Sequence, residues 1–341
     1  MATLASGLVV PWALAILPDG RMLVTERPGR VRVIAGGRLL PDPALTLPVA
    51  SASGTESGLL GLAVHPGYPT PPYVYLFYTR STGAGLVSRV SRFTVLDPSA
   101  QGSLRLGAES VILDGLAGGS CCHFGGRLAF GPDGDLYVTV GDGQVPTRAW
   151  STASLNGKVL RLKDDGSVPA DNPIPGSPVF GYGLRNPEGL AWDAAGNLYA
   201  SDNGPTGEAP GGTALYHHDR LDLVRPGQFL GWPLITGAST PTGLRAPSGL
   251  PAPGAPLIES GSEVSWAPSG ASFFALPGQR PTLLIAELRG TAVLRVFLDP
   301  ADPARVVQTE TVLTGFGRMR DVVTGRDGCV YVLTSNRDGR G

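Results

Sequence analysis

Short runs of alternating apolar and polar residues recur in pairs along the chain, and each pair flanks a turn. The plainest pair lies between residues 127 and 140. Residues 127–130 and 135–140 have the period of two that is typical of half-buried strands. Residues 131–134, Gly-Pro-Asp-Gly, are those that a tight turn favours. This stretch therefore predicts a β-hairpin.

The same pattern occurs six times, in copies that begin at residues 13, 61, 127, 189, 263 and 321. The copy at 263–276 is degraded. Successive copies begin roughly 50 to 75 residues apart, a spacing that suits a four-stranded sheet and a variable loop. The sequence therefore predicts an all-β, six-bladed β-propeller with four-stranded antiparallel blades. Because a propeller closes as one unit, we expect a single domain over residues 1–341.

Composition agrees with a globular, turn-rich protein. The 341 residues include 49 Gly and 32 Pro, yet 42% of them are hydrophobic, which argues against disorder. The net charge of −1 lacks the basic excess of a nucleic-acid surface. No apolar run is long enough to span a membrane. We expect no signal peptide in this sequence, because residues 1–6 lack a basic region and residues 8–17 are predicted as the first strand.

The hairpin at 127–140 is flanked by a histidine and a carboxylate. His123 precedes its first strand and Asp142 follows its second. The two ends of a hairpin lie at the same edge of a sheet, so the two side chains can meet. A carboxylate that orients an imidazole is the arrangement of a general base. The simpler alternative is a structural histidine with a hydrogen-bond partner.

Polar residues gather at the ends of the other hairpins as well. Equivalent positions of successive blades fall on one ring around a propeller axis, so these residues should share one face. Four arginines would stand there, and arginine pairs with carboxylates and phosphates through its planar fork. The pattern favours a small ligand with several carboxylates, although structural salt bridges between blades are the alternative. The residues are Glu56, Arg185, Asn186, Arg289, Arg318 and Arg320.

Cysteine is scarce, and two of the three residues are adjacent. Cys121 and Cys122 directly precede His123, and Cys329 lies far along the chain. The adjacent pair can close as an eight-membered disulfide ring or stay reduced as two apolar thiols, and the sequence leaves both open. A disulfide would favour an oxidising compartment.

Motifs spread along nearly the whole chain resemble those of one family. They lie at residues 11–34, 56–68, 123–142, 156–173, 181–193 and 317–334. Together and in this order they are similar to the soluble pyrroloquinoline quinone (PQQ) dependent glucose/sorbosone dehydrogenases, a family that includes the aldose sugar dehydrogenases. The resemblance implies a six-bladed propeller that oxidises the C1 hydroxyl of aldoses with PQQ and Ca²⁺.

The resemblance also implies a role for each matching residue. His123 would be the general base, Asp142 its orienting carboxylate, and Arg185 with Asn186 the pair beside the quinone. Glu56 matches a Gln or Glu near the base and the quinone. The carbonyls of Gly204 and Pro205 would bind Ca²⁺. Carboxylates of PQQ would bind Arg318 and Arg320, and Arg289 stands where the family usually has Lys.

Three positions depart from the family pattern. Leu184 replaces a histidine in the usual Gly-His-Arg-Asn motif, residues 206–210 replace the acidic run that follows Gly-Pro, and Trp150 aligns best with a common glutamine. The second departure leaves the rest of the calcium shell undefined. Short loops favour the broad-specificity aldose enzymes. We therefore expect a monomer, an aldose substrate, an unidentified electron acceptor and a periplasmic or secreted location.

Two other classes of function remain open. One is a calcium-dependent propeller hydrolase or lactonase, which would need side-chain carboxylates and Asn around a metal at the channel centre. The other is a non-catalytic propeller that binds sugars or proteins. The first is disfavoured by a centre rich in arginine, and the second does not require His123, Asp142 and the arginines together.

Overall fold

The structure, a computed structural model, describes residues 1–98, 102–276 and 278–339. Its regular structure there is almost entirely β-strand, with one short 3-10 helix, η1 (Pro146–Arg148). Five antiparallel sheets have four or five strands each. The first contains β1 (Pro11–Ile16), β2 (Met22–Glu26), β3 (Arg30–Ala35), β4 (Arg38–Leu39) and β5 (Leu45–Thr46). The second contains β6 (Leu59–Val64), β7 (Tyr73–Thr82), β8 (Gly85–Leu96) and β9 (Arg105–Ala117).

The remaining sheets follow in chain order. The third contains β10 (Gly125–Phe130), β11 (Leu136–Val140), β12 (Lys158–Leu162) and β13 (Val179–Tyr182). The fourth contains β14 (Pro187–Trp192), β15 (Leu198–Asp202), β18 (Arg220–Val224) and β21 (Ile258–Glu259). The fifth contains β22 (Pro268–Phe274), β23 (Thr282–Glu287), β24 (Ala292–Leu298) and β25 (Val306–Thr314). A last sheet has two strands, β26 (Met319–Thr324) and β27 (Val330–Thr334).

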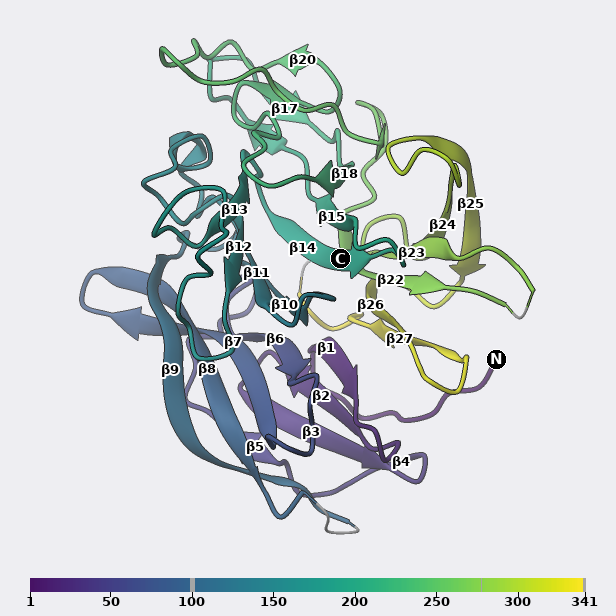
Figure 1. Ribbon diagram of the computed structural model, residues 1–341. Coiled ribbons are helices and arrows are strands. Elements are labelled where there is room, and N and C mark those ends of the chain that lie inside the picture. The colour runs from purple at the N-terminus through teal and green to yellow at the C-terminus, as the bar shows by residue number, and fades with distance from the viewer. Residues whose placement is uncertain (99–101, 277, 340–341) are drawn as a thin grey trace.

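The first strands of these sheets contact one another in a closed order, β1, β6, β10, β14, β22, β26 and again β1. Figure 1 shows the sheets arranged around this ring. The protein is therefore an all-β propeller, and the prediction of four-stranded antiparallel blades is confirmed for four sheets, while the first carries a fifth short strand. In the described residues the sixth hairpin forms only two strands, so the prediction of six four-stranded blades is not confirmed.

Two small hairpins lie outside the blades. One pairs β16 (Thr206–Glu208) with β17 (Leu215–Tyr216), and the other pairs β19 (Ile235–Thr236) with β20 (Thr240–Pro241). The first follows β15 directly and, as shown below, carries a side chain to the functional site.

The predicted fifth hairpin was misplaced by one strand. The middle of the copy at 263–276, where the pattern requires a turn, lies inside β22, and the true hairpin joins β22 to β23. Gly270 is needed for close packing and not for a turn, because a Cβ atom there would lie 1.8 Å from the Asp321 carboxylate on β26. A similar close approach joins β6 to β10, where a Cβ on Gly61 would lie 1.9 Å from the Gly126 carbonyl.

Apolar side chains fill the spaces between neighbouring sheets. Leu60 on β6, Phe77 on β7 and Leu128 on β10 belong to one buried cluster that joins the second and third sheets. Full burial of such a side chain stabilises the fold by about 1.5–3 kcal/mol. Within the described residues, no helix has the length and apolar character needed to cross a membrane.

Candidate active site

The third hairpin brings His123 and Asp142 together as its spacing predicts. β10 and β11 pair from Gly125 opposite Val140 to Phe130 opposite Leu136, so the residues just outside both strands meet. His123 Nδ1 lies 2.7 Å from Asp142 Oδ1. The second oxygen, Oδ2, accepts a hydrogen bond of 2.9 Å from Trp232 Nε1. Because Asp142 is fully buried and both its oxygens are bonded, it fixes the imidazole ring with Nδ1 turned inward.

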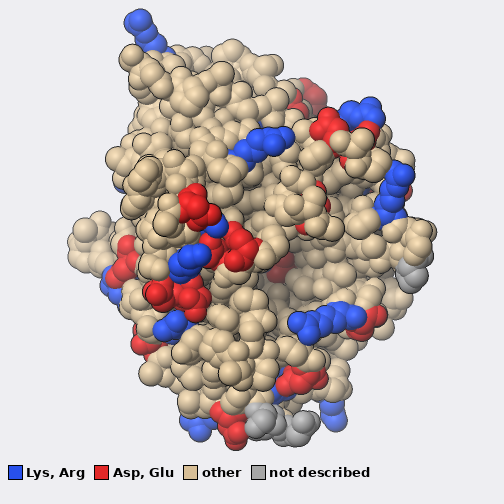
Figure 2. Space-filling model, viewed as in Figure 1, with Lys and Arg blue, Asp and Glu red and all other residues tan. Residues whose placement is uncertain are grey.

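A cavity of about 920 Å³ lies over this pair, and most of the predicted site residues line it. Figure 2 shows the face of the molecule seen in Figure 1, which is hollowed near its middle. Asp142 lies behind His123 and does not reach the cavity wall. Pro205 instead lines a separate small cavity of about 10 Å³. The predicted residues on the main wall are Glu56, His123, Arg185, Asn186, Gly204, Arg289, Arg318 and Arg320.

Arg185 and Asn186 are positioned by a buried carboxylate at the end of β15. Asp202 accepts hydrogen bonds from the backbone N–H groups of Arg185, at 3.0 Å, and Asn186, at 2.7 Å. Burial raises the pKa of Asp202 to about 7, although these hydrogen bonds act in the opposite direction. Asn186 then accepts a hydrogen bond of 2.9 Å from the Gly125 N–H, which ties the residue before β14 to the first residue of β10.

Glu56 joins the loop before β6 to the same place. Its Oε2 atom accepts a hydrogen bond of 2.7 Å from the His123 N–H and one of 3.3 Å from Asn186 Nδ2. Its own N–H donates to the Cys121 carbonyl at 2.7 Å. These contacts hold the His123 backbone, whose φ of +60° is unusual for a residue other than glycine.

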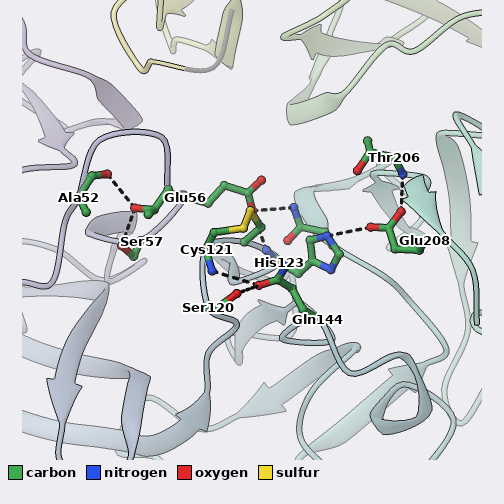
Figure 3. The surroundings of a disulfide bond; sticks show 12 residues. Ala52, Glu56, Ser57, Ser120, Cys121, His123, Gln144, Thr206 and Glu208 are labelled. Atoms are coloured by element: carbon green, nitrogen blue, oxygen red, sulfur yellow. Dashed lines mark hydrogen bonds and ion pairs between the residues drawn. A yellow bond between two sulfur atoms is a disulfide. The ribbon is translucent and has the colours of Figure 1, made fainter.

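Cys121 and Cys122 form a disulfide, which resolves the alternative that the sequence left open. Both residues line the cavity together with His123. Figure 3 shows the disulfide, with Cys121 labelled, close to His123. Cys329 is a free, exposed cysteine.

The arginines gather at another part of the wall. Arg320 donates to Glu188 Oε2 at 2.5 Å, and Arg318 donates through Nε to Asp338 at 3.0 Å. Burial raises the pKa of Glu188 despite the opposing charge of Arg320. Arg289 is exposed at this end, and its side chain forms no hydrogen bond or salt bridge with the described residues. Salt bridges between blades, the alternative weighed from the sequence, are thus present for Arg320 but not for Arg289.

Gly204 and Pro205 lie in the turn between β15 and β16. Gly204 donates its N–H to Asp219 at 2.7 Å, and the Pro205 carbonyl accepts a hydrogen bond of 2.7 Å from the His217 N–H. No group of three or more His, Cys, Asp and Glu side chains is placed to hold a metal ion among the residues that the structure describes.

The electrostatic setting of His123 is unusual. Burial and the nearby Arg185 cation both lower its pKa, but hydrogen bonds to Asp142 and Glu208 outweigh them, so the pKa lies above its ordinary value of 6.5. Glu208 approaches from the far side of the ring, with Oε1 3.4 Å from Nε2. Burial favours its neutral form, yet the contacts with His123 and Arg185 lower its pKa and keep it ionised.

Sequence reasoning missed four residues of this site. Glu208, Gln144, Trp232 and Lys158 were not predicted. Glu208 and Trp232 reach the site from distant segments, whereas Gln144 lies two residues after Asp142, to which its N–H donates at 2.8 Å. Gln144 accepts a hydrogen bond from the Cys121 N–H at 3.0 Å and lines the cavity. Lys158 is fully buried behind Asp142, where burial lowers its pKa to about 7. Two of the four had a sequence signal. Lys158 lies in the motif at residues 156–173, and Glu208 lies in the segment 206–210 that replaces the acidic run of the family.

Comparison with known proteins agrees with this geometry. The glucose/sorbosone dehydrogenase family model matches residues 8–340, so the chain belongs to that family. A crystal structure named as a putative glucose dehydrogenase of Thermus thermophilus is 42% identical, with a TM-score of 0.84, over 100% of this chain and 95% of that one. The PQQ-bound aldose sugar dehydrogenase of Streptomyces coelicolor is 33% identical, with a TM-score of 0.82, over 100% and 92%. The aldose sugar dehydrogenase YliI of Escherichia coli is 30% identical over 96% of this chain and 88% of its own.

Proposed function

We propose that this protein is a PQQ-dependent dehydrogenase that oxidises the C1 hydroxyl of aldose sugars to the lactone. The observation that carries the proposal is that His123, held from behind by Asp142, shares one cavity with four arginines. The family match and the PQQ-bound relative support the cofactor. The name of the Escherichia coli relative supports an aldose as the substrate.

The cavity suits an anion with several carboxylates. Its volume, about 920 Å³, is that of a site for a small molecule. Arg185 Nε and Arg320 Nε are buried without a hydrogen-bond partner in the described residues, so both guanidinium groups retain unused donors. Arg289 is exposed, and its guanidinium group has no partner in the part of the chain that the structure describes. We assign PQQ carboxylates to Arg289, Arg318 and Arg320, and the quinone end to Arg185, Asn186 and Glu56.

The two predicted carbonyls fit Ca²⁺, provided that other ligands complete its coordination shell. Ca²⁺ accepts backbone carbonyls as ligands, and we assign it to the carbonyls of Gly204 and Pro205. The Pro205 oxygen already accepts one hydrogen bond, which leaves it a second lone pair. Two carbonyls do not fill the six to eight positions that Ca²⁺ takes. The remaining ligands would come from the cofactor and from water.

The residues of this chain perform the proton transfer. With Nδ1 held by Asp142, His123 presents Nε2 to the cavity and takes the proton of the C1 hydroxyl. Asp142 stabilises the imidazolium that results. Arg185 stands beside the ring and favours its return to the neutral form. PQQ, polarised by Ca²⁺ when both are bound, supplies the acceptor for the hydride of C1.

The remaining proposals concern the number of domains and blades, the oligomeric state and the cellular location. We propose one domain that closes as a six-bladed propeller, acts as a monomer and is periplasmic or secreted. The disulfide supports an oxidising compartment. The physiological electron acceptor is unidentified, and an artificial dye can replace it in an assay.

Reconstitution tests the proposal. The purified protein is treated with a chelator, and PQQ and Ca²⁺ are then added separately and together with an aldose and a redox dye. We expect dye reduction only when PQQ, metal and sugar are all present. Sugar-independent reduction, or full activity after chelation in a sample shown to be free of metal, would contradict the assignment.

A further inference from the structure

Glu208 occupies the side of His123 that faces the cavity. Its Oε1 atom lies 3.4 Å from Nε2, and the same atom forms an ion pair with Arg185. Figure 3 shows Glu208 and the imidazole ring pointing toward one another. One carboxylate thus contacts both the proposed base and a proposed cofactor residue.

The contact between Glu208 and Nε2 of His123 affects the nitrogen that a general base needs. Nδ1 of His123 is committed to Asp142, so Nε2 is the nitrogen that can accept a substrate proton. A general base must lie within hydrogen-bond reach of the proton that it takes. Because Glu208 stands at Nε2, a sugar hydroxyl can reach that nitrogen only when Glu208 withdraws.

The two carboxylates on the ring differ in how firmly they are held. Asp142 has no exposed surface and bonds to Trp232 and Gln144 as well as to the ring. Glu208 has a side chain that is 24% exposed, and it is carried by the three-residue strand β16, which pairs with only the two residues of β17. Asp142 is therefore a fixed partner, and Glu208 has a route toward solvent.

The charges around the ring favour the imidazolium in this arrangement. A ring with one carboxylate at each nitrogen donates both of its N–H groups, which requires the protonated form. Arg185 opposes this charge, but Glu208 also neutralises Arg185. The charged groups around the ring and its two carboxylates are Asp142, Glu208, Arg185 and Lys158, and Glu56 contacts the backbone N–H of His123.

We propose that Glu208 is a positioning residue that holds His123 in its protonated, resting form and withdraws when a substrate hydroxyl binds at Nε2. The inference rests on the proposed function, since it concerns the same base. Glu208 thereby competes with the substrate and restricts turnover at low pH.

Replacement of the charge without a change of shape tests this inference. Glu208→Gln should lower the pKa of His123 by about one unit, the low end of the effect of a nearby opposite charge. The acid limb of kcat/KM should move to lower pH by the same amount. Below that limb kcat/KM should rise up to about tenfold, since one unit corresponds to a factor of ten. A residue with a merely structural role would lower activity at every pH.

The titration itself can be read without PQQ. The chain has four histidines, so NMR of protein labelled at histidine gives few signals, and the His123 signal is assigned by its loss in His123→Gln. Glu259→Gln is the matched control, because Glu259 pairs with His218 at 2.8 Å away from the main cavity wall. It should leave both the His123 titration and the acid limb unchanged.

Glu208→Ala provides a second variant, which removes the contact with Nε2 altogether. It should lower KM for the sugar at pH values below the wild-type limb and show the same shift in titration. An unchanged His123 titration in both variants, or a shifted titration with an unmoved acid limb, would overturn the inference. A different result would refute the proposed function: the His123 titration behaves as expected, but the wild-type protein does not oxidise sugar with PQQ and Ca²⁺. The proposed effect of Glu208 on turnover would then fail as well.

Discussion

The two ends of the cavity differ in their charged groups. At the imidazole end, Asp142, Glu208 and Glu56 surround His123 and Arg185, so carboxylates outnumber the permanent cation. At the arginine end, three guanidinium groups gather, and two of them form ion pairs with carboxylates. These groups are Arg289, Arg318 and Arg320, with Glu188 and Asp338.

This difference separates two tasks that one site must perform. An excess of carboxylates stabilises a proton on an imidazole, which suits the end where a hydroxyl is deprotonated. A cluster of guanidinium groups stabilises carboxylates of a ligand, which suits the end that holds an anionic cofactor. Substitutions at one end should therefore change reaction rate, and substitutions at the other should change cofactor affinity.

The largest effect is expected at the imidazole end. His123→Gln should lower kcat by about 10²–10⁴, the usual contribution of a positioned base, while PQQ affinity changes little. Steady-state assays with saturating PQQ and Ca²⁺ measure the rate, and absorbance titration measures PQQ binding. A variant with wild-type kcat would place the base elsewhere.

Arg320→Ala tests the arginine end. Loss of a charge-assisted hydrogen bond worth roughly 1.5–3 kcal/mol should weaken PQQ binding about ten- to a hundredfold. Once saturated with PQQ, the variant should turn over near the wild-type rate. Arg305→Ala, which removes an exposed guanidinium group paired with Asp299, serves as the control and should bind PQQ normally. Unchanged PQQ affinity in Arg320→Ala would remove that residue from the cofactor site.

Asp142→Asn should have a smaller effect on rate than loss of the histidine. The imidazole remains, but the carboxylate that raises its pKa is gone, so the acid limb of kcat/KM should move to lower pH. In the wild type this limb should lie above pH 6.5, since activity falls as pH drops through the raised pKa of His123. A decrease of one unit in the pKa of His123 lowers its proton affinity about tenfold. A pH series of kcat/KM checks both statements, and a wild-type limb below pH 6.5 would contradict them.

The smallest effect is expected for Arg289→Lys. Arg289 is exposed, and lysine keeps its charge while losing the planar fork. An exposed charged contact contributes up to about 1 kcal/mol, so PQQ affinity should fall less than about fivefold. Arg289→Ala in the same titration separates the charge from the shape. A loss as large as that of Arg320→Ala would show that the two residues contribute equally.

The sequence predicted the local parts of this site better than the distant ones. The meeting of His123 with Asp142 followed from one hairpin, whose strands have a period that local residues determine. The shared cavity followed from repetition of that hairpin around an axis. The fifth copy failed because Gly270 resembles a turn glycine, whereas its neighbour Asp321 on another sheet is what requires it.

Contacts between distant segments could not be derived in this way. Trp232 reaches Asp142 across 90 positions, and no local pattern marks that hydrogen bond. Glu208 reaches His123 because β16 and β17 form a small hairpin. This hairpin begins in residues 206–210, which replace the acidic run of the family. Such contacts depend on how the loops pack against the folded blades, so no short stretch of the sequence predicts them.

Single-turnover reduction of bound PQQ by an aldose tests the division of the cavity most directly. The reaction is followed by stopped flow over a range of PQQ concentrations in wild type, His123→Gln and Arg320→Ala. The amplitude reports how much PQQ is bound, and the rate reports the chemical step. We expect His123→Gln to keep the wild-type amplitude curve with a rate reduced by about 10²–10⁴, and Arg320→Ala to shift the curve while the saturated rate stays near wild type. Reduction at the wild-type rate in His123→Gln would contradict the assignment of the base. Equal losses of both amplitude and rate in the two variants would contradict the division of the cavity into two ends.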